Sequence, residues 1–390
     1  MQTLPIYLDG HATSPLAPEA LEAMIAALSQ PGNAASPHVH GEMAARHVSY
    51  ARECIANLIG ARPNEVIFTS GATEANNLAI LGVARHAALS QSHRNRIAVS
   101  AIEHKSVLEP AKALRNEGFA IDIIPVDSEG RLDLGALRAI VGPSTLLVSV
   151  MAANNETGVL QDIPVLGEVV HEAGALLHTD AAQAAGKVAI DVLTWDVDYL
   201  SLSGHKLYGP AGVGALFVAA GVPLPAPLMF GGGQQKAVRP GTEPVALLAG
   251  FGAAARVATE RLSHDQVHGR TLVERLRAGL VEHQVRFTVT TGNAPVAPGS
   301  LSLALIGQNA EELVQILSNI VSLSTGSACN SGQILPSHVF SAMNAPSDII
   351  SSVVRIFCGR YNTATEIDVA VEAIARAVAN SALAPGEVRQ

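Results

Sequence analysis

The sequence predicts an α/β fold in which a mostly parallel sheet is covered by helices on both faces, followed by a smaller α+β unit. Short apolar runs alternate with longer segments of helical period through the first part of the 390-residue chain. This alternation is typical of parallel sheets, because the chain must cross over before each new parallel strand. After about residue 243 the alternation gives way to a long helical pattern and a different texture.

Seven apolar runs are predicted to form the strands of the main sheet, at residues 65–70, 96–101, 121–126, 146–151, 175–180, 199–203 and 214–218. Segments such as 74–88 and 164–175 lie between them and carry the apolar spacing of helices. Sheets of this kind bind their ligands beyond the carboxyl ends of the strands. Most of the unusual polar residues of this sequence fall at those ends.

The length of the chain allows one large and one smaller domain, each with its own core. We expect a large domain over residues 14–258. Residues 1–13 and 259–390 are expected to form the small domain, which includes a loop at about 322–335.

The composition limits the partners of the protein. The formal net charge is −9, which argues against a direct nucleic-acid or anionic-membrane partner. The uncharged run 207–235 contains four prolines, so a buried strand followed by a loop is expected rather than a membrane span. The first residues lack the pattern of a signal peptide. Three scattered cysteines do not form a disulfide framework, so we expect a reducing, cytoplasmic setting without disulfides.

A candidate phosphate site follows the first predicted strand, in the stretch TSGATEANN at residues 69–77. Gly71 permits a tight turn, and Ala72 and Thr73 then offer a backbone N–H and a hydroxyl at the start of a helix. Unpaired N–H groups and the helix dipole favour an anion there. The alternative interpretation is a plain helix cap at Thr73.

Three further polar residues follow predicted strands. His104 comes just after the strand at 96–101, although a lone histidine is more often structural. Asp180 ends the strand at 175–180, and Gln183 follows it in an alanine-rich turn. A carboxylate there is placed to pair with a cation, and a protonated ring nitrogen held this way acts as an electron sink. Asp180 as a helix N-cap is the simpler alternative.

Lys206 is the most informative residue, in the stretch SGHKLYGP. It stands between Ser203, His205 and a glycine-rich turn, at the end of a predicted strand. Desolvation disfavours the ammonium form of a lysine, which frees the amine to form a Schiff base with an aldehyde. We therefore expect Lys206 to hold a carbonyl cofactor, with an ordinary surface lysine as the alternative.

Cys329 differs from the other two cysteines. Its run of small polar residues offers no apolar neighbours, so it is interpreted as an accessible nucleophile on a loop. Cys54 and Cys358 lie in apolar helix and strand patterns and are expected to be buried and inert. Downstream, Arg355 provides a planar fork suited to a substrate carboxylate, with a surface ion pair as the alternative.

Taken together, these stretches resemble the cysteine desulfurases, which are class V aminotransferase-like enzymes of pyridoxal 5′-phosphate fold type I. The resemblance runs almost end to end. In chain order, its motifs are YLDGHATSP, IFTSGATEANNLAI, AIEHKSV, NNETGVLQDI, HTDAAQAAGKVAIDV, SGHKLYGPAGVGAL, RPGTEP, STGSACNSG and VRIFCGRYNTATEID. The most specific are SGHK-x-x-GP and GSAC. The form around Cys329 resembles the branch that has the longer catalytic loop.

The resemblance implies roles for these residues. Lys206 would hold pyridoxal 5′-phosphate (PLP) covalently, Asp180 would pair with its ring nitrogen and Gln183 with its ring hydroxyl, and His104 would stack on the ring and move protons. The phosphate would be bound by Thr73, Ser203, His205 and the backbone of Ala72, with Thr242 reaching the phosphate of a neighbouring subunit. Asn155 would lie near the ring, and Arg355 would take the substrate carboxylate. A homodimer is implied, and no resident metal, with Cys329 as a candidate transient ligand of an iron–sulfur species.

The activity implied is removal of sulfur from L-cysteine, which leaves L-alanine and a persulfide on Cys329. That sulfur would pass to an acceptor or scaffold protein for iron–sulfur cluster assembly, or for thiolation of tRNA, a cofactor or DNA. A selenocysteine lyase or a small-amino-acid aminotransferase of the same fold is the alternative, and a non-catalytic scaffold is a third. The chain departs from the family pattern at Gly10-His11, where D-N-x-A-T-T is usual, and at Ala34-Ala35, where N-P-S-S-x-H is usual.

Overall fold

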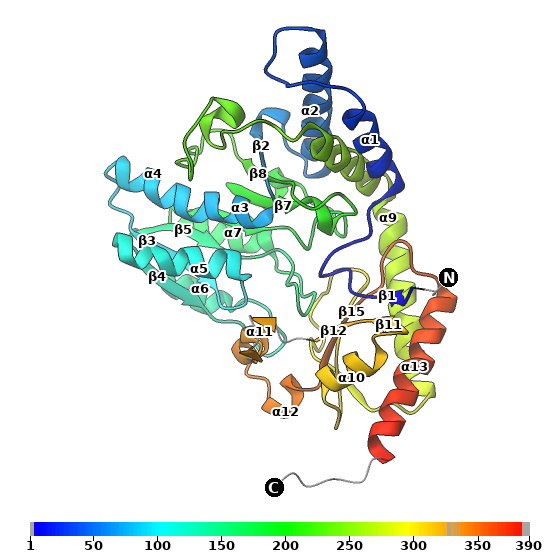
Figure 1. Cartoon of the computed structure of the whole chain (residues 1–390). Helices are drawn as coiled ribbons and strands as arrows, with labels where there is room; N and C mark the ends of the chain where they lie inside the picture. Colours follow the sequence, from blue (N-terminus) through cyan, green and yellow to red (C-terminus); the bar gives the residue numbers. More distant parts are fainter. Residues whose placement is uncertain (1–3, 326–328, 331–332, 335, 384–390) are drawn as a thin grey trace.

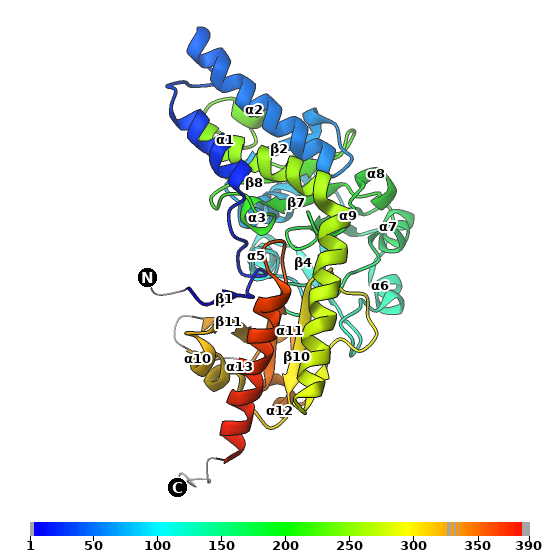
Figure 2. The same ribbon diagram turned by 90° about the vertical axis from the view of Figure 1, so that its right-hand side faces the viewer.

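The computed structural model describes residues 4–325, 329–330, 333–334 and 336–383. A large helix-covered sheet forms one part of the molecule, and a smaller sheet with its own helices forms the other (Figure 1). One long helix, α9 (Val245–Glu282), runs beside both parts, as the two perpendicular views show (Figure 2).

The large sheet has seven strands in the order β2-β8-β7-β6-β5-β3-β4. In chain order these are β2 (Val66–Thr69), β3 (Arg96–Ser100), β4 (Ala120–Ile124), β5 (Thr145–Ser149), β6 (Leu176–Asp180), β7 (Tyr199–Ser203) and β8 (Gly214–Val218). Only β8 runs against its neighbours, so the sheet is mostly parallel. All seven strands coincide with the apolar runs of the sequence, which confirms the predicted fold class.

Helices cover both faces of this sheet. They are α1 (Pro18–Leu28), α2 (Val39–Leu58), α3 (Ala72–Asn77), α4 (Val83–Leu89), α5 (Lys105–Leu114), α6 (Leu134–Ile140), α7 (Ile163–Glu172) and α8 (Val192–Trp195). Successive strand residues point to opposite faces. Ile97 and Val99 accordingly join the cluster under α3, α4 and α5, whereas Ala98 joins the cluster under α2, α7 and α9. A π-helical turn, Leu78–Gly82, links α3 to α4.

The smaller sheet has four strands in the order β12-β15-β10-β9, namely β9 (Phe287–Val289), β10 (Ser300–Leu305), β12 (Ser324–Thr325) and β15 (Val353–Phe357). Two short pairs accompany it: β1 (Ile6–Tyr7) with β11 (Val321–Ser322), and β13 (Cys329–Asn330) with β14 (Gln333–Ile334). Its helices are α10 (Ala310–Leu317), α11 (His338–Ala342), α12 (Ser347–Ile350) and α13 (Ala364–Leu383). Side chains of α9, α10 and α13 fill its core with residues of β10 and β15.

Helix α9 crosses residue 258, where the sequence suggested a domain boundary, without a break. The division at that residue therefore stays a prediction. The uncharged run 207–235 contains β8 followed by loop, as predicted. Within the described part of the chain, no helix combines the length and apolar character that a membrane crossing requires.

Candidate active site

A cavity of about 460 Å³ opens at the carboxyl edge of the large sheet. The ends of β2, β6 and β7 meet there, together with the loops that follow β3 and β5. The smaller sheet contributes one side chain, that of Arg355 on β15. The edge also receives the N-terminal segment, whose His11 and Ala12 line the cavity.

Lys206 lies at this edge, in the short helical turn Gly204–Lys206 that directly follows β7. Its Nζ donates hydrogen bonds to the carbonyl oxygens of His11, at 2.5 Å, and Ala12, at 2.8 Å. Desolvation lowers the pKa of the amine to about 8, with the nearby Arg355 charge acting in the same direction. Lys206 therefore carries a substantial neutral fraction at mildly alkaline pH, which is the form that attacks a carbonyl carbon.

Asp180, His104 and two intervening residues form a hydrogen-bonded chain along the wall of the cavity. Asn76 on α3 donates from Nδ2 to Asp180 Oδ2, at 2.7 Å, and to Ser106 Oγ, at 2.8 Å. Ser106 Oγ lies 2.7 Å from His104 Nδ1, and the Ser106 backbone N–H donates to the same nitrogen. Nδ1 is thus the acceptor, and the proton of the neutral ring is on Nε2. Desolvation also lowers the pKa of His104, outweighing the attraction of Asp180.

Gln183 is buried at the base of the cavity, where His11 and Lys187 hold its side chain. Its Nε2 donates to the carbonyl oxygen of His11 at 2.8 Å. Its Oε1 lies 3.1 Å from Nδ1 of His11 and accepts from Lys187 Nζ at 3.2 Å. Burial is the main cause that lowers the pKa of both His11 and Lys187, the latter to about 7.

A second group of cavity-lining residues is rich in hydrogen-bond donors. Ala72 begins α3, Thr73 is exposed to the cavity mouth, and Ser203 ends β7. His205 Nδ1 lies 3.1 Å from Thr13 Oγ1, and desolvation lowers its pKa to about 4, so the ring is neutral near pH 7. These groups can bind an anion through N–H and O–H donors.

Arg355 is fixed at the side of the cavity by two oxygens. Its guanidinium donates to Asp9 Oδ1 at 2.8 Å and to the carbonyl oxygen of Asn155 at 3.0 Å. Its Nε is buried and has no hydrogen-bond partner within the described residues. Asp9 therefore orients the arginine without satisfying all its donors.

Thr242 does not line this cavity and is exposed on the surface. Cys329 forms β13 with Asn330, and its side chain lies outside the described residues. The segment that carries it begins next to the site, because Ser324 of β12 pairs with Arg355. Cys54 and Cys358 are buried, as predicted.

Sequence reasoning missed the residues that hold the predicted ones: Asp9, Asn76, Ser106 and Lys187. Their signal was weak, since Asn76 lies within a helix and Ser106 resembles a capping serine. A lysine at the end of the alanine-rich stretch HTDAAQAAGK was the clearest available hint of a buried amine. Among the described residues, no group of three or more histidines, cysteines or carboxylates is arranged to hold a metal ion.

Comparison with known proteins defines the class first. The family model "Aminotransferase class-V" matches residues 6–369. The chain is 39% identical to a protein of Dictyostelium discoideum named "Probable cysteine desulfurase, mitochondrial", over 96% of this chain and 83% of that one. It is 40% identical to the cysteine desulfurase of Mus musculus, over 94% and 80%.

Solved structures agree with this result. A NifS-like protein superposes with a TM-score of 0.89 at 34% identity, covering 97% of this chain and 100% of that one. SspA in complex with cysteine superposes with a TM-score of 0.80 at 32% identity, covering 92% and 100%. The protein belongs to the class V aminotransferase family. Within that family it belongs to the cysteine desulfurases.

The same relatives correct the expected location. Desulfurases from Dictyostelium discoideum, Candida albicans and Candida maltosa are named as mitochondrial, which contradicts the cytoplasmic setting expected from the cysteines. The physical reason is that a low cysteine count reports only a reducing environment, and it does not distinguish one reducing compartment from another.

Proposed function

We propose that this protein is a PLP-dependent cysteine desulfurase that moves the sulfur of L-cysteine onto Cys329 and releases L-alanine. The observation that carries the proposal is the convergence in one cavity of a lysine with a lowered pKa and a buried, hydrogen-bonded carboxylate. The same cavity is lined by Ala72, Thr73, Ser203 and His205, whose N–H and O–H groups can bind an anion.

The residues fit PLP in chemical terms. Its three recognisable groups are an aldehyde, a ring nitrogen and a phosphate. The cavity offers Lys206 for the first and the Asp180 carboxylate for the second. Ala72, Thr73, Ser203 and His205 remain for the phosphate. When bound, PLP supplies an electron sink for the bonds to the substrate Cα.

The side chains of this protein then have separate tasks. Neutral Lys206 supplies the amine that would hold the cofactor and, once released, a base near the substrate. His104 can exchange protons only through Nε2, because Nδ1 is occupied by Ser106. Arg355, oriented by Asp9, binds and orients the substrate carboxylate.

Sulfur transfer falls to Cys329. Its thiolate attacks the sulfur of the bound substrate, an S–S bond forms as the substrate C–S bond breaks, and the electrons of that bond stay with the carbon fragment, which takes up protons to become alanine. The pairing of β12 with β15 supports this role, because the segment that carries Cys329 starts beside the arginine assigned to the substrate.

A second copy of the chain is part of the proposal. Large apolar side chains are exposed on and beside α1 and α2, among them Leu28 at 71% and Val39 at 67%, and Phe230 in the loop before Thr242 is 91% exposed. Burying such groups in a homodimer is favourable. It would also give Thr242 a phosphate to bind. The sulfur acceptor is a further protein that receives the persulfide sulfur.

The test is peptide mass spectrometry after brief incubation of the PLP-loaded enzyme with L-cysteine and no reductant. One extra sulfur on the Cys329 peptide, with alanine released, is the expected result. Cys54→Ala serves as the matched control and should keep the adduct, whereas Cys329→Ala should lose it. Alanine without the adduct would assign another sulfur carrier, and no alanine would point to an aminotransferase or a scaffold.

A further inference from the structure

Lys187 is a buried lysine that none of the steps above uses. It is 7% exposed and contacts Gln183, a residue of the cavity wall that precedes it by four positions. Its Nζ donates to two oxygens of Gln183, the carbonyl oxygen at 3.1 Å and Oε1 at 3.2 Å. On its other side Nζ lies 5.2 Å from the centroid of the Phe357 ring. A buried amine with such partners indicates a specific task.

The contacts of Lys187 determine which way the amide of Gln183 faces. In its charged form, below the pKa of about 7, the Lys187 amine can only donate, so the Gln183 atom beside it is the oxygen. The other contacts agree, because Nε2 donates to the carbonyl oxygen of His11. A flipped amide would place its NH₂ group against Lys187 and its oxygen against the His11 oxygen, and both contacts are repulsive.

One amide N–H remains after these contacts are counted. Nε2 carries two protons, and the His11 oxygen accepts one of them. Gln183 lines the cavity that also contains Lys206. The fixed amide therefore offers a donor, and not an acceptor, to a group bound in the cavity.

The Phe357 ring has room beside Lys187 because residue 10 is glycine, one of the positions at which the sequence departs from the family pattern. A Cβ on Gly10 would lie 2.3 Å from Cδ1 of Phe357, so the ring fits only because residue 10 has no side chain. The same ring contacts His11 edge-on, with centroids 5.0 Å apart. Phe357 and His11 thus enclose Lys187 and keep water from the amine.

We propose that Lys187 is a positioning residue of the active site, which fixes the amide of Gln183 so that its free N–H donates to an oxygen of the bound cofactor. This inference rests on the proposed PLP chemistry. The donor would stabilise a negative charge on that oxygen and so lower the proton affinity of the cofactor–Lys206 linkage. The other charged or titratable groups around the two amines are Asp9, His11, His104, Asp180, His205 and Arg355.

The experiment titrates cofactor-free protein with PLP and then scans the absorbance of the loaded protein against pH. Compared with wild type, Lys187→Met should weaken PLP binding by about 3- to 10-fold, the value of one lost hydrogen bond. The pKa read from the absorbance should rise by about half a pH unit to one. Lys112→Met, at an exposed lysine on α5, is the matched control and should behave as wild type.

Two Gln183 variants test whether Lys187 acts through the amide. In a Gln183→Ala background, Lys187→Met should have little further effect on either readout. Gln183→Glu keeps an oxygen for Lys187, and hence the buried contact, but removes both amide N–H groups, the free one and the one that donates to His11. It should therefore weaken PLP binding as Lys187→Met does. Because the contact is kept, this variant tests the proposal even if Lys187→Met folds poorly.

The outcomes separate the two proposals. If wild type gives no PLP-dependent absorbance, the proposed function fails. If wild type binds PLP but Gln183→Glu binds it equally tightly, the donor role of Gln183 is wrong and the inference is overturned. Additive effects of Lys187→Met and Gln183→Ala would also overturn it, since Lys187 would then act by another route.

Discussion

Ser106 determines which ring nitrogen of His104 accepts a hydrogen bond, and so which nitrogen carries the proton of the neutral ring. Its backbone N–H and its hydroxyl both contact Nδ1, and Asn76 holds the hydroxyl from the other side. Asp180 is the carboxylate at the other end of this series of hydrogen bonds. A change at Ser106 should therefore affect proton transfer without removing a group that touches the substrate.

Ser106→Ala tests this at the level of one residue. Loss of the hydroxyl removes one hydrogen bond to His104 Nδ1, so kcat for alanine release should fall by about 3- to 10-fold. Steady-state kinetics with L-cysteine measures it. Ser318→Ala, at an exposed serine that ends α10, is the control and should leave kcat unchanged. An unchanged kcat in Ser106→Ala would show that the hydrogen bond from the Ser106 hydroxyl to His104 Nδ1 does not contribute to proton transfer.

Lys206 gives a second prediction, about pH. Because desolvation lowers its pKa to about 8, the neutral amine is already abundant at that pH. The rate at which PLP binds to cofactor-free protein should rise up to about pH 8 and then level off. An ordinary lysine would keep the rate rising towards its usual pKa of about 10.4. Stopped-flow absorbance measures the profile, and a continued rise above pH 9 would contradict the lowered pKa.

The residues proposed as catalytic could be predicted from sequence where their chemistry depends on local position. Lys206, Asp180 and His104 each lie at or just after the end of a strand, so a linear pattern is enough to place them. The partners could not be found this way, because Asn76 is 104 residues from Asp180 and becomes its neighbour only through the crossover of the sheet. Lys187 is harder still, since its burial depends on Phe357 from the other sheet.

Helix α11 shows how an element next to the site is anchored. Ser337 Oγ accepts from the backbone N–H groups of Val339 and Phe340, and donates to Glu156 Oε2 at 2.5 Å. His338 Nε2 donates to the carbonyl oxygen of Glu103 at 2.9 Å. Burial raises the pKa of Glu156 to about 7, while the Ser337 hydroxyl acts in the opposite direction. The start of α11 is therefore tied to the turn that contains Asn155.

Ser337→Ala should destabilise the protein, and more so at high pH. The lost cap costs about 1 kcal/mol at any pH. Without the hydroxyl the pKa of Glu156 rises further. The folded variant then holds the proton to higher pH than the folded wild type does. Relative to wild type, the variant therefore loses additional stability as pH rises past 7. Denaturant unfolding at pH 5 and pH 8 measures both effects, and an equal loss at the two pH values would exclude the carboxyl contribution.

A second prediction at the scale of elements concerns the contact between Gly10, in the N-terminal segment, and Phe357 on β15. Gly10→Asn should lower the free energy of unfolding by about 1 to 3 kcal/mol, because the new side chain overlaps the Phe357 ring. In a Phe357→Ser background the same change should cost at least about 1 kcal/mol less. Chemical denaturation of the four proteins measures this coupling. Equal costs in both backgrounds would show that the ring is not what excludes a side chain at residue 10.

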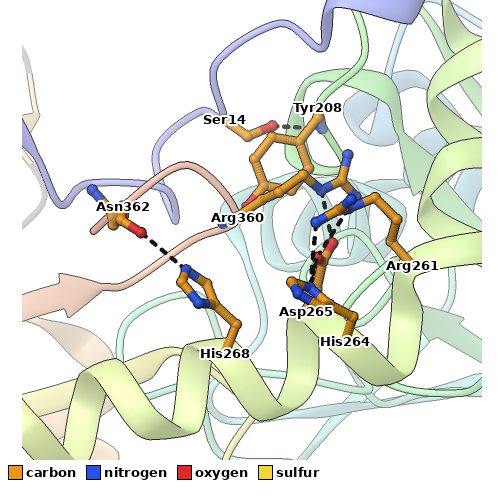
Figure 3. Close-up of polar contacts among 8 residues, drawn as sticks. All are labelled: Ser14, Tyr208, Arg261, His264, Asp265, His268, Arg360 and Asn362. Carbon is orange, nitrogen blue, oxygen red and sulfur yellow. Dashed lines mark hydrogen bonds and ion pairs between the residues drawn. The ribbon is translucent and has the colours of Figure 1, made fainter. Parts of the chain in front are cut away.

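At the scale of the whole molecule, Arg360 connects three parts of the chain (Figure 3). Its Nε donates to Asp265 on α9 at 2.7 Å, and its guanidinium lies 4.2 Å from the centroid of the Tyr208 ring. Its backbone N–H donates to the Tyr208 hydroxyl, while the Tyr208 N–H donates to Ser14 Oγ. Tyr208 has a φ of 65°, which is unusual for a tyrosine, two residues beyond Lys206. The cluster thus stabilises the turn that presents Lys206.

Asp265→Asn should be among the most damaging changes outside the cavity. It leaves the Arg360 guanidinium, whose side chain is 3% exposed, without its carboxylate. The expected cost is about 3 to 5 kcal/mol of unfolding free energy. Asp368→Asn is a matched control. Asp368 forms an ion pair with Arg275 of α9, so this pair too involves α9, but both of its side chains are about half exposed. It should change stability barely at all, and similar losses in both variants would refute the argument from burial.

The large sheet was easier to predict than the small one. Most of its strands are buried on both faces and read as continuous apolar runs, whereas several strands of the smaller part are only two residues long. No periodicity can be detected in two residues. The pairing of β1 with β11 was equally hidden, because nothing in Ile6–Tyr7 indicates a partner more than 300 residues away.

That pairing also has a consequence for biosynthesis. The carbonyl groups that hold Lys206 belong to a segment that leaves the ribosome early, yet its strand partners, Val321 and Ser322, leave late. At a bacterial or eukaryotic elongation rate, about half a minute separates the two events. During that interval the nascent chain exposes an unpaired strand beside an unfinished pocket. The amine of Lys206 therefore reaches its final environment only after Val321 and Ser322 have left the ribosome.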